Sequence, residues 1–380
     1  MITFEQGPIR PPSEAGSLLL RFSRNCPWNR CTFCPVYKGQ KFSRRSLREI
    51  LEDIDSVSAI IRDLERQSHA MGFGGKMTQS LLSAVLKDPA YGSAYHYVAY
   101  WHIGGNGRVF IQDANSLILP DDVLIEALQY LRRNVPGIQR VTSYGRSSTL
   151  ARKSREQLAA LHTAGLDRIH IGLESGSPQV LRFVMKGATP EEHVAAGTKV
   201  KDAGITLSEY VMPGLGGKRW SHEHATETAR VLNAIDPHFI RLRSLRIPPS
   251  TPLYRDVAEG RFTPLSDDET AEEILLFLQS LQGIHSHLTS DHIMNLLPEV
   301  QGTLPQDRDA MMATVEKYLA LPREERLLYR LGRRGGALHA LADIQNPTVR
   351  ARLEAARRDL ETQWGGDLEQ LITELGDRYI

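Results

Sequence analysis

Residues 17–35 read SLLLRFSRNCPWNRCTFCP and contain every cysteine of this 380-residue chain. Residues 17–22 are largely apolar and predict a buried strand. Three thiols, Cys26, Cys31 and Cys34, follow that strand within nine residues. Secreted disulfide frameworks use an even number of cysteines spread along the chain, so three clustered thiols do not match that class. The stretch therefore predicts a strand that leads into a metal or cluster site in a reducing compartment.

Five further strand-like runs follow, at residues 108–112, 139–143, 168–173, 205–212 and 238–245. Helical patterns separate them, and the predicted helices cover 47–64, 121–133, 154–163, a start at Pro178, a start at Pro190, and 222–233. Ser154 lies three residues before Gln157, as in a capping box, and Thr189 precedes proline at a first helical position. This alternation predicts an α/β fold, a partial (βα)6 TIM-like barrel with a helical C-terminal region.

The same pattern suggests how the chain is divided. We expect an N-terminal extension over 1–15, the partial barrel over 16–250, and a mainly helical region over 251–380. Residues 66–107 are rich in Gly, Tyr and His and separate the first helix from the second strand. We interpret them as an insertion or lid.

The composition is that of a globular protein, with 41% hydrophobic and 24% charged residues. Lys and Arg number 46 against 45 Asp and Glu, so no global field directs the chain to nucleic acid or to a membrane. No apolar run approaches the length of a membrane span, and the N-terminus does not match a signal peptide. We therefore expect a cytoplasmic protein with no membrane partner.

Polar and small residues follow most of the predicted strands. In parallel α/β folds the chemistry gathers at the carboxyl ends of the strands, so these loops are the candidate ligand site. The candidate residues in these loops are Gln112, Asp113, Asn115, Ser143, Glu174, Ser175, Pro213 and Gly214.

The cysteine spacing is C-x4-C-x2-C, and thiolate ligands suit zinc or iron–sulfur clusters. Structural zinc needs a fourth ligand, for which only a histidine such as His96 or His102 is available. A [4Fe–4S] cluster normally takes four cysteines, so three would leave one iron open to an external ligand. A zinc-stabilised, non-enzymatic binding protein stays as an alternative to a cluster enzyme.

On these residues the chain resembles the radical S-adenosylmethionine (SAM) superfamily, over roughly residues 15–250. GLESGS at 172–177, the Lys186-Gly187 pair and VMPGLGG at 211–217 are similar to the later strand motifs of that family. Glu-Ser-Gly-Ser resembles the branch with anaerobic coproporphyrinogen oxidase, Elongator-type tRNA enzymes and methylthiotransferases. Two features depart from the family. Four residues, not three, separate the first two cysteines, and residues 112–115 stand where the family has Gly-Gly-Glu.

The resemblance implies that Cys26, Cys31 and Cys34 hold a [4Fe–4S] cluster whose fourth iron binds SAM. It also implies that Phe33 contacts the adenine of SAM and that a one-electron donor such as flavodoxin or ferredoxin is a partner. The remaining SAM contacts are expected among Gln112, Asp113, Asn115, Ser143, Glu174, Ser175, Lys186, Met212, Pro213 and Gly214. No cysteine is left for an auxiliary cluster, which argues against methylthiotransferases and favours hydrogen abstraction by a 5′-deoxyadenosyl radical.

Arg241 and Arg243 are two residues apart on the sixth predicted strand, so their side chains share a face. We expect them to point into the barrel and to bind a carboxylate or phosphate of a small-molecule substrate. Pairing with Glu209 and Asp236 is the structural alternative. RNA is the alternative substrate, because residues 323–358 hold nine Arg against four acidic residues. No side chain is assigned a catalytic role.

Overall fold

A computed structural model describes residues 2–364, 369, 372, 374 and 375. The chain divides into two compact units. The N-terminal unit comprises the residues up to Asn29, Val36–Ile171 and Ala195–Leu207. The C-terminal unit comprises Arg30–Pro35, Gly172–Val194 and the residues from Ser208 onward. The chain thus crosses between the units at both ends of residues 30–35, and again within two strands and one helix.

The strands are mostly parallel. In the N-terminal unit, β1 (Leu18–Arg21), β4 (Arg108–Gln112), β5 (Arg140–Gly145) and the beginning of β6 (Arg168–Glu174) pair in parallel in that order. In the C-terminal unit, the end of β7 (Thr206–Val211), β8 (Phe239–Leu242) and β9 (His287–Thr289) pair in parallel, and β10 (Gly302–Thr303) pairs antiparallel with β9. β6 and β7 pass from one unit into the other, and the strand order is β1-β4-β5-β6-β7-β8-β9-β10.

All six predicted strands are therefore present, each within two residues of its predicted ends or shorter. Apolar residues alternate on them, for example Ile169, Ile171 and Leu173 on β6, each without exposed surface. The order begins at β1 and ends at β10 without closing, which confirms an open, mostly parallel α/β fold. β9 and β10 were not predicted, nor was the short antiparallel pair of β2 (Ser23–Arg24) and β3 (Ser43–Arg44).

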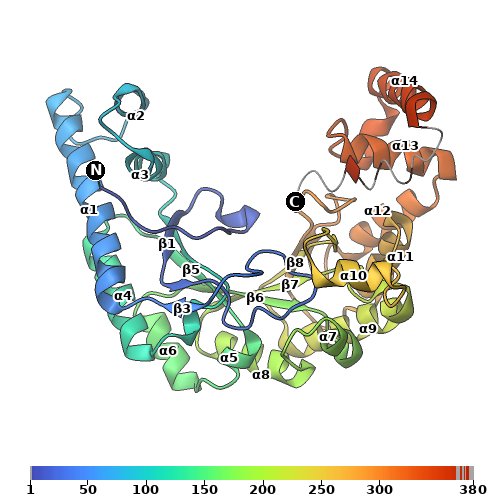
Figure 1. The fold of residues 1–380 in the computed structure, drawn as a ribbon, viewed down its shortest axis with the longest axis horizontal. Helices are drawn as coiled ribbons and strands as arrows, with labels where there is room; N and C mark the ends of the chain where they lie inside the picture. The colour runs from blue at the N-terminus through green and yellow to red at the C-terminus, as the bar shows by residue number, and fades with distance from the viewer. Residues whose placement is uncertain (1, 365–368, 370–371, 373, 376–380) are drawn as a thin grey trace. The chain divides into compact units, whose positions relative to one another are not determined.

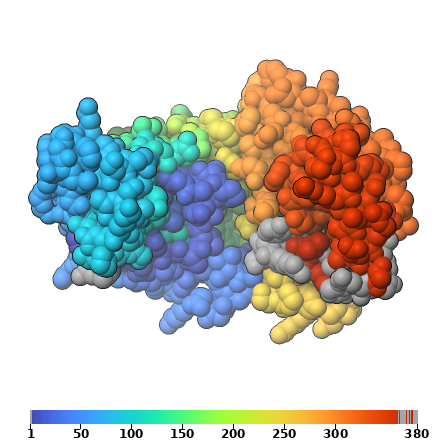
Figure 2. All heavy atoms as spheres, turned by 90° about the horizontal axis from the view of Figure 1, so that it is seen from above, coloured from blue at the N-terminus to red at the C-terminus, as the bar shows by residue number. Residues whose placement is uncertain are grey.

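Helices connect the strands of the N-terminal unit (Figure 1). The helices of this unit are η1 (Pro12–Glu14), α1 (Leu47–Ala70), α2 (Gln79–Lys87), α3 (Ser93–Gly104), η2 (Ser116–Ile118), α4 (Asp121–Asn134), α5 (Ser147–Leu150) and α6 (Arg155–Thr163), and α8 (Pro190–Asp202) ends in it. The predicted capping box is present at α6, where the Ser154 side chain accepts from Gln157 N–H. The predicted insertion consists of the end of α1 with α2 and α3, which lie on the surface of this unit (Figure 2).

The C-terminal unit is mainly helical after β8. Its helices are α7 (Pro178–Phe183), α9 (Gly217–Ile235), α10 (Pro252–Ala258), α11 (Asp267–Ser280), α12 (Arg308–Leu319), α13 (Arg323–Arg334), η3 (Leu341–Gln345) and α14 (Pro347–Trp364), and α8 begins in it. α11 packs against α9 and α12, and α13 packs against α14. None of the helices described is both long enough and apolar enough to cross a membrane.

Candidate functional site

The cysteines lie on the loop that follows β1 and β2, and all three are half-buried and form no disulfide. In the N-terminal unit, Cys26 Sγ accepts a hydrogen bond from Asn29 N–H at 3.3 Å. Cys31 and Cys34 belong to the C-terminal unit. In the part of the chain that the structure describes, no three His, Cys, Asp or Glu side chains, the three cysteines included, are arranged to hold a metal ion.

Backbone hydrogen bonds fasten the segment 30–35 within the C-terminal unit. Thr32 N–H donates to the Val184 carbonyl at 3.0 Å, and Leu253 N–H donates to the Thr32 carbonyl at 3.0 Å. Phe33 is 8% exposed and packs in an apolar cluster with Met212, against which Cys31 and Cys34 also pack. The predicted adenine contact, the predicted strand-end residue Met212 and two of the thiols therefore lie together.

An ion pair joins two more of the predicted residues. Lys186 Nζ lies 3.0 Å from Glu174 Oε1, and both side chains are 13% exposed. The same ammonium lies 5.9 Å from the centre of the Phe33 ring. Cys31 Sγ lies 4.0 Å from the Lys186 carbonyl oxygen. The pair packs over Gly172, where a Cβ would lie 2.2 Å from Glu174 Oε1, so a side chain at residue 172 would displace it.

Two residues that the sequence did not single out hold the loop after β7. His224 is buried, with Nε2 at 3.0 Å from the Met212 carbonyl and Nδ1 at 2.8 Å from Ser175 Oγ. Because a carbonyl only accepts, Nε2 carries a proton and donates to the Met212 carbonyl. Glu273 Oε1 accepts from Gly214 N–H at 2.6 Å. Gly214 has φ +87°, a left-handed conformation that favours glycine.

Glu209, on β7, is the unusual acid of the C-terminal unit. Its side chain has no exposed surface, and neither carboxyl oxygen has a hydrogen-bond partner among the described residues. Burial raises its pKa well above the ordinary value, and the negative charge of Glu174 raises it further while Lys186 opposes the shift. The neutral form of Glu209 is therefore favoured, because an unpaired buried carboxylate is costly.

The polar residues predicted in the N-terminal unit are all engaged by the protein. Gln112 Oε1 accepts from Gly7 N–H at 2.8 Å, and its amide donates to the Gly7 and Ile9 carbonyls at 3.0 and 2.8 Å. Asn115 donates to Thr149 Oγ1 at 2.9 Å and accepts from Arg146 N–H at 3.1 Å. The hydroxyl of buried Ser143 donates to the Tyr144 carbonyl at 3.1 Å.

Asp113 is also fully hydrogen-bonded within the protein. Its side chain has no exposed surface. Oδ2 accepts from Arg21 Nε at 2.7 Å and from Asn25 N–H at 2.6 Å, and Oδ1 accepts from the Tyr37 hydroxyl at 3.0 Å. The carboxylate is therefore hydrogen-bonded to residues that precede the cysteines in the sequence and to one that follows them.

The two predicted substrate arginines have different surroundings. Arg241, on β8, is 7% exposed, and its guanidinium lies 3.2 Å from Ser208 Oγ and 3.3 Å from Asp291 Oδ2. Asp291 is thus its carboxylate partner, not Glu209 or Asp236. Arg243 lies just beyond the end of β8, is exposed, and has no carboxylate partner among the described residues.

The pKa of His292 depends in part on the positive charge of Arg243. Burial, together with the positive charge of Arg243, lowers the pKa of His292 to about 4. His292 is consequently neutral near neutral pH, and Arg243 supplies the positive charge here.

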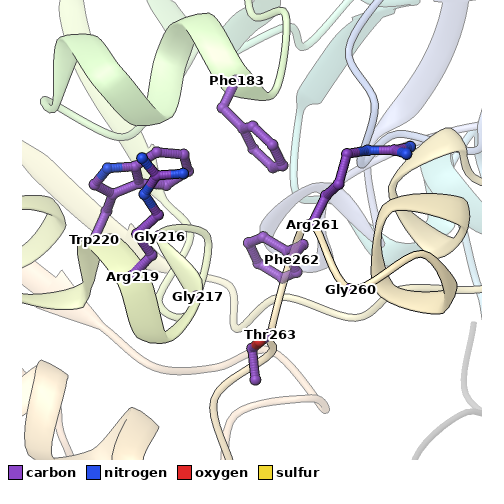
Figure 3. A pocket seen from close by; sticks show the side chains of 9 residues that line it. All are labelled: Phe183, Gly216, Gly217, Arg219, Trp220, Gly260, Arg261, Phe262 and Thr263. Carbon is purple, nitrogen blue, oxygen red and sulfur yellow. The ribbon is translucent and has the colours of Figure 1, made fainter.

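A cavity of about 360 Å³ also lies within the C-terminal unit. Figure 3 shows Phe183, Trp220 and Phe262 facing one another around it, with Arg261 extending away. Phe262 belongs to the same apolar cluster as Phe33, but no predicted SAM or substrate residue lines the cavity.

Comparison with known proteins gives the class of this chain. Residues 95–229 match the family model described as the radical SAM superfamily. About a third of the chain therefore resembles the radical SAM superfamily, the family that the cysteine segment and the later strand motifs indicated.

The chain is 24% identical over 228 residues to 4'-phospho-dehydrooxetanocin synthase of Priestia megaterium. This match covers 58% of the chain and 27% of that protein. It is 25% identical over 118 residues to tRNA uridine(34) acetyltransferase of Methanocaldococcus jannaschii. This match covers 31% of the chain and 22% of that protein. The chain thus spans about a quarter of the length of these relatives.

Among solved structures, coproporphyrinogen III oxidase (HemN) from Escherichia coli superimposes with a TM-score of 0.43 and 14% identity. The match covers 69% of this chain and 50% of that one.

Proposed function

We propose that this chain is a radical SAM enzyme that binds a [4Fe–4S] cluster through Cys26, Cys31 and Cys34. The observation that carries the proposal is the convergence, within the C-terminal unit, of Cys31, Cys34 and Phe33 with the Glu174–Lys186 pair. Three thiols without a fourth cysteine suit a cluster with one open iron. The hydrogen bond from Asn29 N–H to Cys26 Sγ also supports it, because N–H donors stabilise cluster sulfur ligands.

SAM carries a carboxylate, an ammonium, ribose hydroxyls and a flat adenine, and this unit offers groups suited to each. Lys186 would pair with the carboxylate, and Glu174 would accept from a hydroxyl or the ammonium. Phe33 and Met212 would pack on the adenine, and the backbone of Pro213 and Gly214 would lie beside it. When bound and reduced, the cluster would supply one electron that splits SAM into methionine and a 5′-deoxyadenosyl radical, which abstracts hydrogen from substrate.

The side chains of Gln112, Asp113, Asn115, Ser143 and Ser175 have a different role in this proposal. Their hydrogen bonds are made within the protein, so they would hold strand ends and loops in place instead of contacting SAM. His224 acts in the same way, since it links Ser175 to the Met212 carbonyl.

The substrate is proposed to be a small anion bound at Arg243. That guanidinium is exposed and has no carboxylate partner among the described residues, whereas Asp291 offsets much of the charge of Arg241. The name of one relative, 4'-phospho-dehydrooxetanocin synthase, denotes a phosphorylated product, which is consistent with an anionic substrate.

RNA modification is the second candidate, because other relatives are named tRNA uridine(34) acetyltransferase. Most of the Arg-rich segment, however, is engaged within the C-terminal unit. Arg326, Arg330 and Arg334 pair with Asp267 or Asp268, Arg350 with Glu325, and Arg357 with Glu324. A surface whose charges are already neutralised attracts phosphates weakly, which favours the small anion.

Anaerobic reconstitution tests the proposal. About four irons per chain, and 5′-deoxyadenosine on reduction with dithionite or flavodoxin, are expected. Replacing any one of the three cysteines by Ala should abolish both. Binding of zinc without iron would contradict the proposal and favour a zinc-stabilised binding protein. Tight RNA binding with a steep salt dependence would favour the second candidate.

A further inference from the structure

We infer that the Asp113 carboxylate positions the cysteine loop, defined as residues 26–34, by accepting hydrogen bonds from the Asn25 backbone before it and from the Tyr37 side chain after it. Asp113 is thus a positioning residue and not a SAM ligand. The inference rests on the proposed function, because the position of this loop matters only if the thiols hold a cluster.

The hydrogen bonds of Asp113 join the two ends of the loop. One carboxylate oxygen accepts from the N–H of Asn25, the residue directly before Cys26, at 2.6 Å. The other oxygen accepts from the hydroxyl of Tyr37, three residues after Cys34, at 3.0 Å. All these residues lie in the N-terminal unit, and Tyr37 is 2% exposed. A single buried side chain therefore holds the entry and the exit of the loop.

Asn29 ties one thiol into the same arrangement. Its N–H donates to Cys26 Sγ at 3.3 Å, and its side-chain amide donates to the Tyr37 carbonyl at 2.6 Å. Lys38 Nζ donates to the Asn29 carbonyl at 3.0 Å. Any movement of Tyr37 would therefore be passed through Asn29 to Cys26.

The backbone supports a role in positioning. Asn25, Asn29 and Asp113 have φ of 68°, 47° and 64°, in the left-handed region where residues other than glycine are uncommon. Asn and Asp tolerate this region best, but such conformations persist only where the surrounding contacts require them. Three of them are connected by the hydrogen bonds described above.

Gly7 covers the carboxylate and leaves it no further space. A Cβ at residue 7 would lie 2.5 Å from Asp113 Oδ1, the oxygen that accepts from Tyr37. Gly7 N–H is itself bonded to Gln112 Oε1 at 2.8 Å. With three protein donors and no exposed surface, the carboxylate has no room for an added ligand.

Two small substitutions test the inference without removing the carboxylate. Tyr37→Phe deletes one donor, and Gly7→Ala pushes on the oxygen that this donor contacts. Tyr329→Phe is the matched control for the first, since its buried hydroxyl donates to the Leu296 carbonyl. Gly104→Ala is the control for the second, since a Cβ there meets nothing within 4 Å.

The measurement is the anaerobic rate of iron loss to a chelator, followed by cluster absorbance. We expect Tyr37→Phe and Gly7→Ala to lose iron about tenfold faster than the wild type, and the controls to stay within twofold. The electron paramagnetic resonance spectrum of the reduced cluster should broaden in these two variants, because the thiols adopt several positions. Wild-type rates and spectra in both variants would overturn the inference.

Asp113→Asn separates positioning from SAM binding. Among molecules that retain a full cluster, we expect SAM to bind with wild-type affinity. Loss of SAM binding at full cluster loading would instead make Asp113 a SAM ligand and overturn the inference. If the wild-type protein takes up no iron–sulfur cluster at all, the proposed function itself fails.

Discussion

The polar residues that follow the strands serve different purposes in the two units. In the N-terminal unit, Gln112, Asp113 and Asn115 are buried and hydrogen-bonded to other parts of the protein. In the C-terminal unit, Glu174 and Lys186 form a partly exposed ion pair, and Arg243 is exposed. The same sequence signal can therefore indicate a scaffold or a ligand site. The difference depends on whether the protein itself already satisfies the polar group.

Glu174→Ala should have the largest effect, because it removes a group assigned to ligand binding. We expect the Kd for SAM to rise by roughly 10- to 100-fold, the equivalent of about 1–3 kcal/mol for polar partners left unpaired. Titration calorimetry on the cluster-loaded protein measures it, with the exposed Glu223→Ala as control. An unchanged Kd would mean that the two units do not differ in the way described above.

Asn115→Ala should lower the stability of the protein and leave its affinity for SAM nearly unchanged. Removing its side chain leaves Arg146 N–H and the Thr149 hydroxyl without their partner, so the free energy of unfolding should fall by about 1–2 kcal/mol. The affinity of the folded protein for SAM should change less than twofold. Urea unfolding and calorimetry together check it, and a large loss of affinity with unchanged stability would refute the scaffold role.

Glu209→Gln tests a buried acid of the C-terminal unit that has no hydrogen-bond partner among the described residues. Its pKa in the folded protein is raised, so its contribution to stability is fully present below the ordinary pKa of about 4.5 and is lost as pH rises through the folded value. The variant should therefore unfold a few degrees higher than the wild type at pH 8, and at nearly the same temperature at pH 4.5. A gain of equal size at both pH values would show that charge is not the cause.

The smallest of these effects should be the influence of Arg243→Ala on the titration of His292. The pKa of His292 is about 4, and burial is a larger cause than Arg243. Without the arginine the pKa should rise but stay below 6.5, as NMR of the histidine ring can measure. Because the folded pKa is depressed, the stability from neutral His292 is present above pH 6.5 and is lost toward pH 4. Removing Arg243 should make this acid loss smaller, whereas Arg261→Ala should not.

Much of the fold could be predicted because its signals are local. The six strands carry alternating or continuous apolar runs, and Ser154 and Thr189 cap helices with partners three residues away. β9 and β10 could not be predicted from the sequence. β9 has three residues and β10 has two, which is too short for an alternation of apolar and polar residues to be visible. They become strands only by pairing next to β8.

The candidate site was predictable in its residue types more than in their roles. The three thiols are visible as neighbours in sequence, and Phe33 and Glu174 follow strands directly. His224 and Glu273 lie on helices with nothing around them in sequence to mark them. Their importance comes from contacts with residues as far as 49 and 59 positions away.

By itself, then, the sequence determined the order of strands and helices and the grouping of three thiols after the first strand, since these depend on residues only a few positions apart. Only the tertiary structure decided which charges are satisfied. Asp113 accepts hydrogen bonds from Tyr37 and Asn25, which are 76 and 88 positions away in the sequence. Glu209, in contrast, has no hydrogen-bond partner among the described residues. Burial and long-range hydrogen bonds control the energy of a charge, and both arise only when distant segments pack together.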